Sequence, residues 1–145
     1  MEAGLGRASY VVAATKHVRL ARFGAHIEVD GRTWFDGRAG CVLVGNVGRV
    51  LGGIRVFPDA SPDDGRLDVG VVTAEGLVQW ARALGRAVTG DPTRSPFVRE
   101  TRGRKVHIEL DRKIRYELDG GVRGRTRRLR ARIRHHAVEV CVSGQ

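Results

Sequence analysis

The residues best suited to chemistry lie in one segment of this 145-residue chain, Asn46–Gly70. It contains the glycine pair Gly52-Gly53 and, further along, the run Asp63-Asp64-Gly65. Glycine occurs where the backbone must adopt a positive φ or come close to another group. Paired aspartates beside glycine and proline favour a tight, oxygen-rich turn that could hold a hard cation. The segment is therefore interpreted either as a binding site or as a long polar turn between two strands.

The order of the motifs in this segment resembles that of one protein family. The motifs are Gly-Asn, Gly-Gly, Pro-x-Ala and Asp-Asp-Gly-x-Leu-Asp-Val. They are similar to the second domain of the bacterial diacylglycerol kinase family of lipid kinases, which also includes the sphingosine kinase relatives. The resemblance covers nearly the whole chain, because later segments fall where the closing strands of the family fall. These segments are Lys105–Leu110, Lys113–Leu118, Asp119-Gly120 and Leu129–Val142.

The resemblance implies a fold and a parent reaction. The fold is mainly β, an antiparallel β-sandwich with one or two helices in a single domain over residues 1–145. The reaction is the ATP-dependent phosphorylation of a hydroxyl group on a diacylglycerol-like lipid. In the family, a Gly-Gly-Asp-Gly-Thr loop in the first domain binds the nucleotide phosphates. The 145 residues contain neither that loop nor a Walker-type G-x-x-x-x-G-K-[ST] motif.

This lack of a phosphate loop determines what we expect of the chain by itself. The N-terminal nucleotide-binding domain is expected to be absent, ATP to bind only with a separate nucleotide-binding domain, and the isolated chain to be inactive. The chain is thus interpreted as a C-terminal fragment of a lipid kinase. The alternative is a non-catalytic partner that docks onto a separate nucleotide-binding domain. Self-association into a homo-oligomer could also bury the exposed cleft face.

The resemblance implies a structural magnesium ion at the acidic turn. Its ligands would be the side chain of Asp64 and the backbone carbonyls of Ser61 and Arg66. Mg²⁺ prefers octahedral oxygen coordination and keeps several waters, so one carboxylate with two carbonyls suits it. Asp63 or Asp68 could replace Asp64 in this role.

The catalytic base of the family is a glutamate that follows Asp-Gly in a late hairpin. Here Gly121 stands at that position, directly after Asp119-Gly120. Glycine cannot accept a proton, so either the base is lost or a nearby carboxylate, Asp119 or Glu117, has taken the role. The same Asp-Gly-Gly composition also suits a simple hairpin turn.

Three further positions match the family near the cleft between its two domains. They are Asn46, Gly52 and Gly53, where small residues would let a nucleotide or a lipid headgroup approach the backbone. The alternative is that the glycine pair forms a bulge or bend in a strand.

The charge of the chain is its second strong feature. The formal net charge is +10 and the aromatic content is 6%. On a strand, Arg128, Arg130, Arg132 and Arg134 would project from one face. Such a face could bind the phosphates of an anionic membrane surface, a nucleotide or nucleic acid, or simply be solvated. Nucleic acid ranks second, because single-strand binders stack bases on aromatic side chains and these are scarce here.

A cytoplasmic protein, peripheral at the inner membrane face, fits the remaining features. No apolar run approaches the length that crosses a bilayer, and the first residues do not resemble a signal peptide. Cys41 and Cys141 are too few and too isolated for a disulfide framework or a zinc site.

The elements that would position these residues are mostly strands. Asp30-Gly31 predicts a tight hairpin, and alternating apolar residues predict antiparallel strands in the last third, including one at Val138–Val142. Thr73 is expected to cap a helix over Glu75–Val88. The apolar face of this helix would contain Leu77, Trp80, Ala81, Leu84 and Val88. The remaining expected elements are a helix at Arg7–Arg22, a strand at Gly40–Val44 and a loop at Asp91–Pro96.

Overall fold

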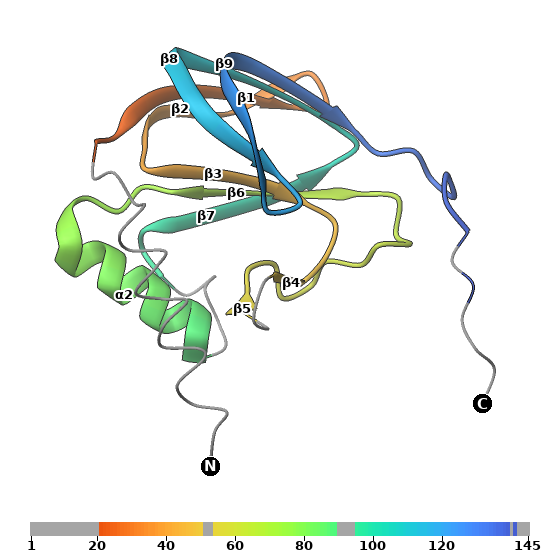
Figure 1. The fold of residues 1–145 in the computed structure, drawn as a ribbon, viewed down its shortest axis with the longest axis horizontal. Helices are drawn as coiled ribbons and strands as arrows, with labels where there is room; N and C mark the ends of the chain where they lie inside the picture. Colours follow the sequence, from red (N-terminus) through yellow and green to blue (C-terminus); the bar gives the residue numbers. More distant parts are fainter. Residues whose placement is uncertain (1–20, 51–53, 90–94, 140, 142–145) are drawn as a thin grey trace.

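The computed structural model describes residues 21–50, 54–89, 95–139 and 141, and these residues form a β-sandwich (Figure 1). One antiparallel sheet has four strands in the order β2-β1-β8-β9, and a second has three in the order β3-β6-β7. Helix α2 lies beside the three-stranded sheet, away from the four-stranded one. The strands are β1 Phe23–Val29, β2 Arg32–Ala39, β3 Cys41–Gly45, β4 Arg49–Val50, β5 Ile54–Arg55, β6 Leu67–Val72, β7 Val98–Gly103, β8 Lys105–Leu118 and β9 Gly121–Arg132; the helix is α2 Gly76–Thr89.

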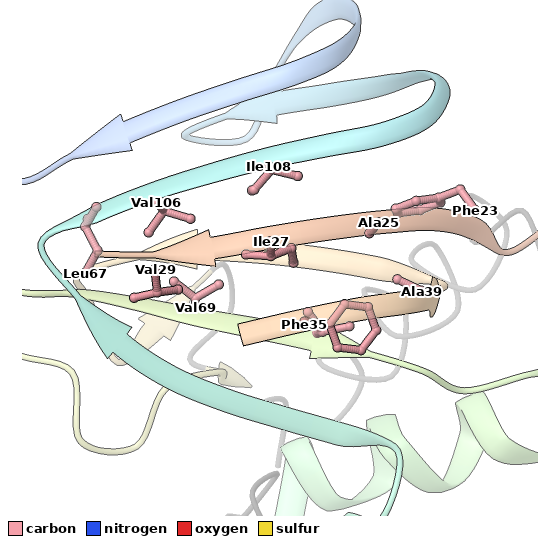
Figure 2. Packing of buried hydrophobic residues seen from close by; sticks show 11 residues of the cluster. Phe23, Ala25, Ile27, Val29, Phe35, Ala39, Leu67, Val69, Val106 and Ile108 are labelled. Carbon is pink, nitrogen blue, oxygen red and sulfur yellow. The ribbon is translucent and has the colours of Figure 1, made fainter. Parts of the chain in front are cut away.

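The core lies between the two sheets and follows from the period-two alternation of apolar residues (Figure 2). Strand β1 buries every second side chain, and β6 buries Val69 and Val71 completely. Antiparallel pairing brings these residues opposite apolar residues of β8 and β3. The buried cluster comprises Phe23, Ala25, Ile27, Val29, Phe35, Ala39, Leu67, Val69, Val71, Val106 and Ile108. The predicted fold class, an antiparallel sandwich with a helix, is confirmed.

The hairpin predicted at Asp30-Gly31 is confirmed. It also binds the backbone at the point where β7 passes into β8. Both residues have positive φ, 50° and 79°, as a two-residue turn of this hand requires. The Asp30 carboxylate accepts hydrogen bonds from the backbone N–H groups of Lys105 and Arg104, both 2.9 Å long. These bonds lower the pKa of Asp30, with the Lys105 bond contributing most.

Helix α2 forms where expected, but its first residues and its buried face differ from the prediction. Thr73 does not cap it, because its hydroxyl donates to the Phe97 carbonyl (3.3 Å) and so joins the ends of β6 and β7. The helix packs through Trp80 and Ala83, both buried. Leu77 and Ala81 are therefore rotated outward, and Leu77 is 67% exposed. Leu84 is half-buried as expected, and the Val88 side chain lies outside the described residues.

The last third of the chain differs from the predicted meander in three ways. The segments 105–110 and 113–118 form one strand, β8, with an irregular register between Glu109 and Ile114. Strand β7 was not predicted, because Val98 is its only large apolar residue. The strand predicted at Val138–Val142 is wrong where it is described: residues 137–139 are irregular and Val138 is 79% exposed, with no described strand to pair with.

Some expectations fall on other parts of the chain. The predicted helix at Arg7–Arg22 lies outside the described residues except for Ala21 and Arg22, which are not helical. The predicted loop at Asp91–Pro96 is described only at Ser95 and Pro96, which precede β7 without regular structure.

Candidate functional site

The acidic turn at residues 61–66 is confirmed as a turn and is held by its own side chains. The Ser61 hydroxyl donates a hydrogen bond to Asp63, and the Arg66 backbone N–H donates to Asp64 Oδ1 at 2.8 Å. The Ser61 hydroxyl bond is the main cause of a lowered pKa at Asp63, and His135 and His136 add to it by their charge. The turn therefore presents ionised oxygen at the surface.

A residue far along the chain contacts this turn. His135 Nε2 lies 3.1 Å from the Asp63 carbonyl oxygen, and its ring stacks on His136 with centroids 3.8 Å apart. A Cβ added at Gly65 would lie 3.5 Å from the His135 ring. The segment that follows β9 thus packs against the acidic turn.

The turn leads into a buried ion pair on the outer face of the three-stranded sheet. Asp68 lies opposite Arg102 in the β6–β7 register, and Arg102 Nε donates to Asp68 Oδ1 at 2.7 Å. The Asp68 side chain is only 6% exposed, and its second oxygen, Oδ2, is buried without a hydrogen-bond partner in the described structure. The hydrogen bond to Asp68 raises the pKa of Arg102, and the negative charges of Asp59 and Asp64 contribute in the same direction.

The aromatic ring of Phe57 covers part of the same outer face. A Cβ added at Gly70 would lie 3.0 Å from Phe57 Cε1, so a side chain at this position would force the buried Phe57 ring to shift. The Phe57 backbone N–H in turn points to the Gly48 carbonyl oxygen at 3.4 Å. Asn46 begins the connection that carries this ring, directly after Gly45, the β3 partner of Asp68.

The structure brings together one part of the predicted site. Ser61, Asp64 and Arg66 share a single turn, and Asp68, two residues further on, is the second residue of β6. Gly52 and Gly53 lie outside the described residues. Asp68 differs from Asp64 in being buried and paired with Arg102 through Oδ1, whereas Asp64 is exposed; which aspartate would hold an ion stays a prediction.

The hairpin tip that carries Gly121 is a separate feature. Asp119 and Gly120 both have positive φ, 49° and 79°, and Leu118 pairs directly with Gly121. The Asp-Gly pair is therefore a two-residue hairpin turn. Gly121 is exposed, and an added Cβ would meet only the Leu118 carbonyl oxygen, at 3.4 Å. In the described structure, no hydrogen bond or ion pair joins this tip to the acidic turn.

The donor set at the acidic turn fits a hard cation. Across the described ranges, no group of three His, Cys, Asp or Glu side chains could hold a metal ion. A cation at this turn would rely on one carboxylate and on backbone carbonyls, which are the oxygen ligands that Mg²⁺ takes. One Asp64 oxygen already accepts the Arg66 N–H, which leaves Oδ2 for an ion.

Arg102 and His135 are the contacts that the sequence did not reveal. Arg102 lies within β7, a strand whose composition does not reveal it. His135 is exposed, and its ring lies against the turn. For both residues the partner is distant in the sequence, so no local pattern identifies it.

No helix in the described residues is long and apolar enough to cross a membrane. Cys41 and Cys141 are free thiols. Burial, and to a smaller extent the charge of Glu117, raises the pKa of Cys41 to about 11, so this thiol stays protonated near neutral pH.

Comparison with known proteins identifies the family. A family model described as the YegS C-terminal NAD kinase beta sandwich-like domain matches residues 1–142. The diacylglycerol kinase of Bacillus subtilis (strain 168) is 28% identical over 94 residues, which are 65% of this chain and 31% of that protein. The chain thus spans about a third of the length of this relative.

Solved structures give the same result. A putative diacylglycerol kinase from Bacillus anthracis str. Sterne matches with a TM-score of 0.68 and 26% identity, over 93% of this chain and 46% of the other. A second structure with a similar description, from the same organism, has a TM-score of 0.66 and 25% identity, over 86% and 41% of the two chains. This chain belongs to the family of the YegS C-terminal β-sandwich domain, the C-terminal domain of the diacylglycerol-kinase-like lipid kinases.

Proposed function

We propose that this chain is the β-sandwich part of an ATP-dependent lipid kinase, which phosphorylates the hydroxyl group of a diacylglycerol-like lipid when a nucleotide-binding domain is present. The observation that carries the proposal is the match of most of the chain to less than half of a putative diacylglycerol kinase. The rest of that kinase has no counterpart in these 145 residues, which also contain no phosphate loop. The isolated chain is therefore inactive in this proposal.

Phosphoryl transfer requires an aligned γ-phosphate, neutralisation of its charge and a base for the attacking hydroxyl. The hairpin tip offers Gly121 where the family has its base, and Gly121 has no group to accept a proton. The carboxylates nearest to Gly121 on this hairpin are Asp119 in the turn and Glu117, whose register partner is Val122. A base supplied by the hairpin tip would be one of these two.

The acidic turn would have a structural role. Asp64 would bind Mg²⁺ through its carboxylate, and Ser61 and Arg66 would bind it through their backbone carbonyls. The hydrogen bonds within the turn support this role, because they order the turn before an ion binds. A bound Mg²⁺ would supply positive charge at the surface of the domain, and ATP itself would bind to the separate nucleotide-binding domain.

The test is a domain exchange. This chain would replace the matching segment of the Bacillus subtilis diacylglycerol kinase, and ATP-dependent phosphorylation of diacylglycerol would be measured in mixed micelles. We expect background turnover from the isolated chain and clear turnover from the chimera that carries Gly121→Glu. Robust turnover by the isolated chain would contradict the proposal. Asp119→Asn and Glu117→Gln in the chimera without the Gly121 change would show whether either carboxylate serves as the base.

A second candidate is a non-catalytic partner of a separate nucleotide-binding domain, and the glycine at position 121 favours it. This candidate predicts that the two domains bind each other as separate chains, while the Gly121→Glu chimera makes no product although its parent kinase is active. Sequencing the DNA upstream of the first codon adds a direct check, since an adjacent frame with a Gly-Gly-Asp-Gly-Thr loop would indicate a split kinase. In both candidates the protein is cytoplasmic and acts at the inner membrane face.

A further inference from the structure

The outer face of the four-stranded sheet carries a compact group of cations. Val106 points into the core, so its neighbours in β8, Lys105 and His107, point outward. In the register with β9, Lys105 lies opposite Arg132 and His107 lies opposite Arg130. Four basic side chains thus form two adjacent cross-strand pairs.

This arrangement is costly for a sheet by itself. Like charges directly opposite each other destabilise strand pairing. Strand positions that cost stability without a packing benefit point to a function outside the fold. An anion bound between the pairs would remove the repulsion and turn it into attraction.

The nearby carboxylates do not neutralise the three permanent cations of the group. Glu28 lies 3.7 Å from His26 Nε2 and 3.7 Å from His107 Nδ1, so it serves the two histidines. Glu109 pairs with Arg128 at 3.3 Å. Within residues 21–139 as far as they are described, no carboxylate forms an ion pair with Lys105, Arg130 or Arg132.

These cations surround an open hollow of about 540 Å³. Lys105, His107, Arg130 and Arg132 line it, and Glu28 lines its side toward β1. We propose that this hollow binds a phosphate group, with the guanidinium groups of Arg130 and Arg132 as paired donors and Lys105 as a point charge. Guanidinium groups match phosphate oxygens in a bidentate manner, and ammonium groups add charge without that geometry.

The hollow is a second site and does not depend on the kinase proposal. None of its lining residues belongs to the acidic turn or to the hairpin tip. The phosphate could come from a soluble phosphate or from the headgroup of an anionic lipid, since the same donors would recognise both. A face of cations could also bind nucleic acid, but the lining contains no Phe, Tyr or Trp side chain on which a base could stack.

The experiment compares two double variants of the full chain that lose equal charge. Arg130→Gln/Arg132→Gln changes the hollow, and Arg123→Gln/Arg125→Gln changes exposed arginines elsewhere on β9. Inorganic phosphate would be titrated against chloride at matched ionic strength, with backbone amide shifts at residues 105, 130 and 132 followed by NMR. Sedimentation with phosphatidylcholine vesicles, with and without phosphatidylglycerol, would test the lipid source, and a short RNA would test nucleic acid.

We expect the hollow variant to lose about tenfold or more in affinity and the control variant less than about twofold, because charge-assisted hydrogen bonds are lost only in the first. This pattern with inorganic phosphate assigns a soluble ligand, and the same pattern only with phosphatidylglycerol vesicles assigns a lipid headgroup. Equal losses in both variants, or binding to neither phosphate probe, would overturn the proposal. Binding to RNA alone would also overturn it, in favour of a nucleic-acid surface.

Discussion

Arg102 lies directly opposite Asp68 in the β6–β7 pair, and its Nε donates a 2.7 Å hydrogen bond to the Asp68 carboxylate. The Asp68 side chain is almost completely buried, whereas the Arg102 side chain is about one-third exposed. Arg102 therefore stabilises the negative charge of the buried Asp68 carboxylate on the outer face of the three-stranded sheet. This pair links the acidic turn before β6 to a strand that the sequence did not reveal.

Removal of Arg102 should destabilise the domain. Arg102→Met leaves the Asp68 carboxylate buried without its donor, and we expect the free energy of unfolding to fall by about 1–3 kcal/mol. This free energy is measured by urea denaturation, with unfolding monitored by circular dichroism. Arg104→Met is the matched control, since Arg104 is exposed and no ion pair to its side chain is described. If Asp68→Asn restored no stability to the Arg102→Met variant, the loss of stability in that variant would not come from the unpaired carboxylate.

Gly103 should tolerate no side chain. A Cβ there would run into Val29 Cγ1 and lie 2.9 Å from Asp30 Oδ2. Gly103→Ala is expected to lower stability by about 1–3 kcal/mol, because the hairpin at Asp30 would have to shift. Gly85→Ala is the control: an added Cβ meets nothing within 4 Å. Because alanine has a higher helix propensity than glycine, Gly85→Ala should raise the free energy of unfolding by about 0.8–1 kcal/mol. Thermal unfolding should move in opposite directions for the two variants.

Asp30 should make part of the stability dependent on acid pH. Backbone hydrogen bonds from Lys105 and Arg104 lower the pKa of Asp30 below its usual value of 3.8. A lowered carboxyl pKa adds stability above the unfolded pKa, and this stability is lost as the pH falls through the folded pKa. The difference in urea midpoint between wild type and Asp30→Asn should therefore be constant near neutral pH and shrink below about pH 4. A difference that stays constant to low pH would show that the charge of Asp30 contributes nothing.

Mg²⁺ should stabilise the domain through Asp64. If the turn binds the ion, roughly hundredfold excess over Kd adds about 2–3 kcal/mol to the free energy of unfolding. Thermal unfolding in MgCl₂, compared with KCl at equal ionic strength, measures the effect. Asp64→Asn should abolish the shift and Asp59→Asn should preserve it, since Asp59 lies outside the turn. An equal shift in all three proteins would place any bound Mg²⁺ elsewhere.

Local sequence patterns predicted the parts of the fold whose conformation is decided by residues close together in the sequence. The Asp-Gly dipeptides marked both tight hairpins, because each requires two consecutive residues with positive φ. Alternating apolar residues identified β8 and β9, each of which has one face toward the core. Strand β7 escaped because its pairing with β6, and not its own composition, makes it a strand.

The candidate site also has one part that the sequence predicts and one part that it does not. The turn at residues 61–66 was predictable, since aspartate, glycine and proline carry the turn in their own conformational preferences. The contacts of Arg102 with Asp68 and of His135 with Asp63 join residues 34 and 72 positions apart in the sequence. Such contacts depend on sheet register and on chain path after β9, which no short pattern encodes. The magnesium ion and the base stay predictions.

The long strand β8 has one further consequence. Its first part, residues 106–109, is paired on both sides, with β1 and β9, whereas Ile114–Leu118 pairs with β9 alone. The tip that carries Gly121 thus stands on an arm whose end contributes no residue to the buried cluster. A substitution of Gly121, which is exposed and does not have a positive φ, should therefore change folding stability little, so mutation and selection can alter the chemistry of this position without first compensating for lost stability. A domain built in this way can lose or regain a catalytic group over evolutionary time while its scaffold stays the same.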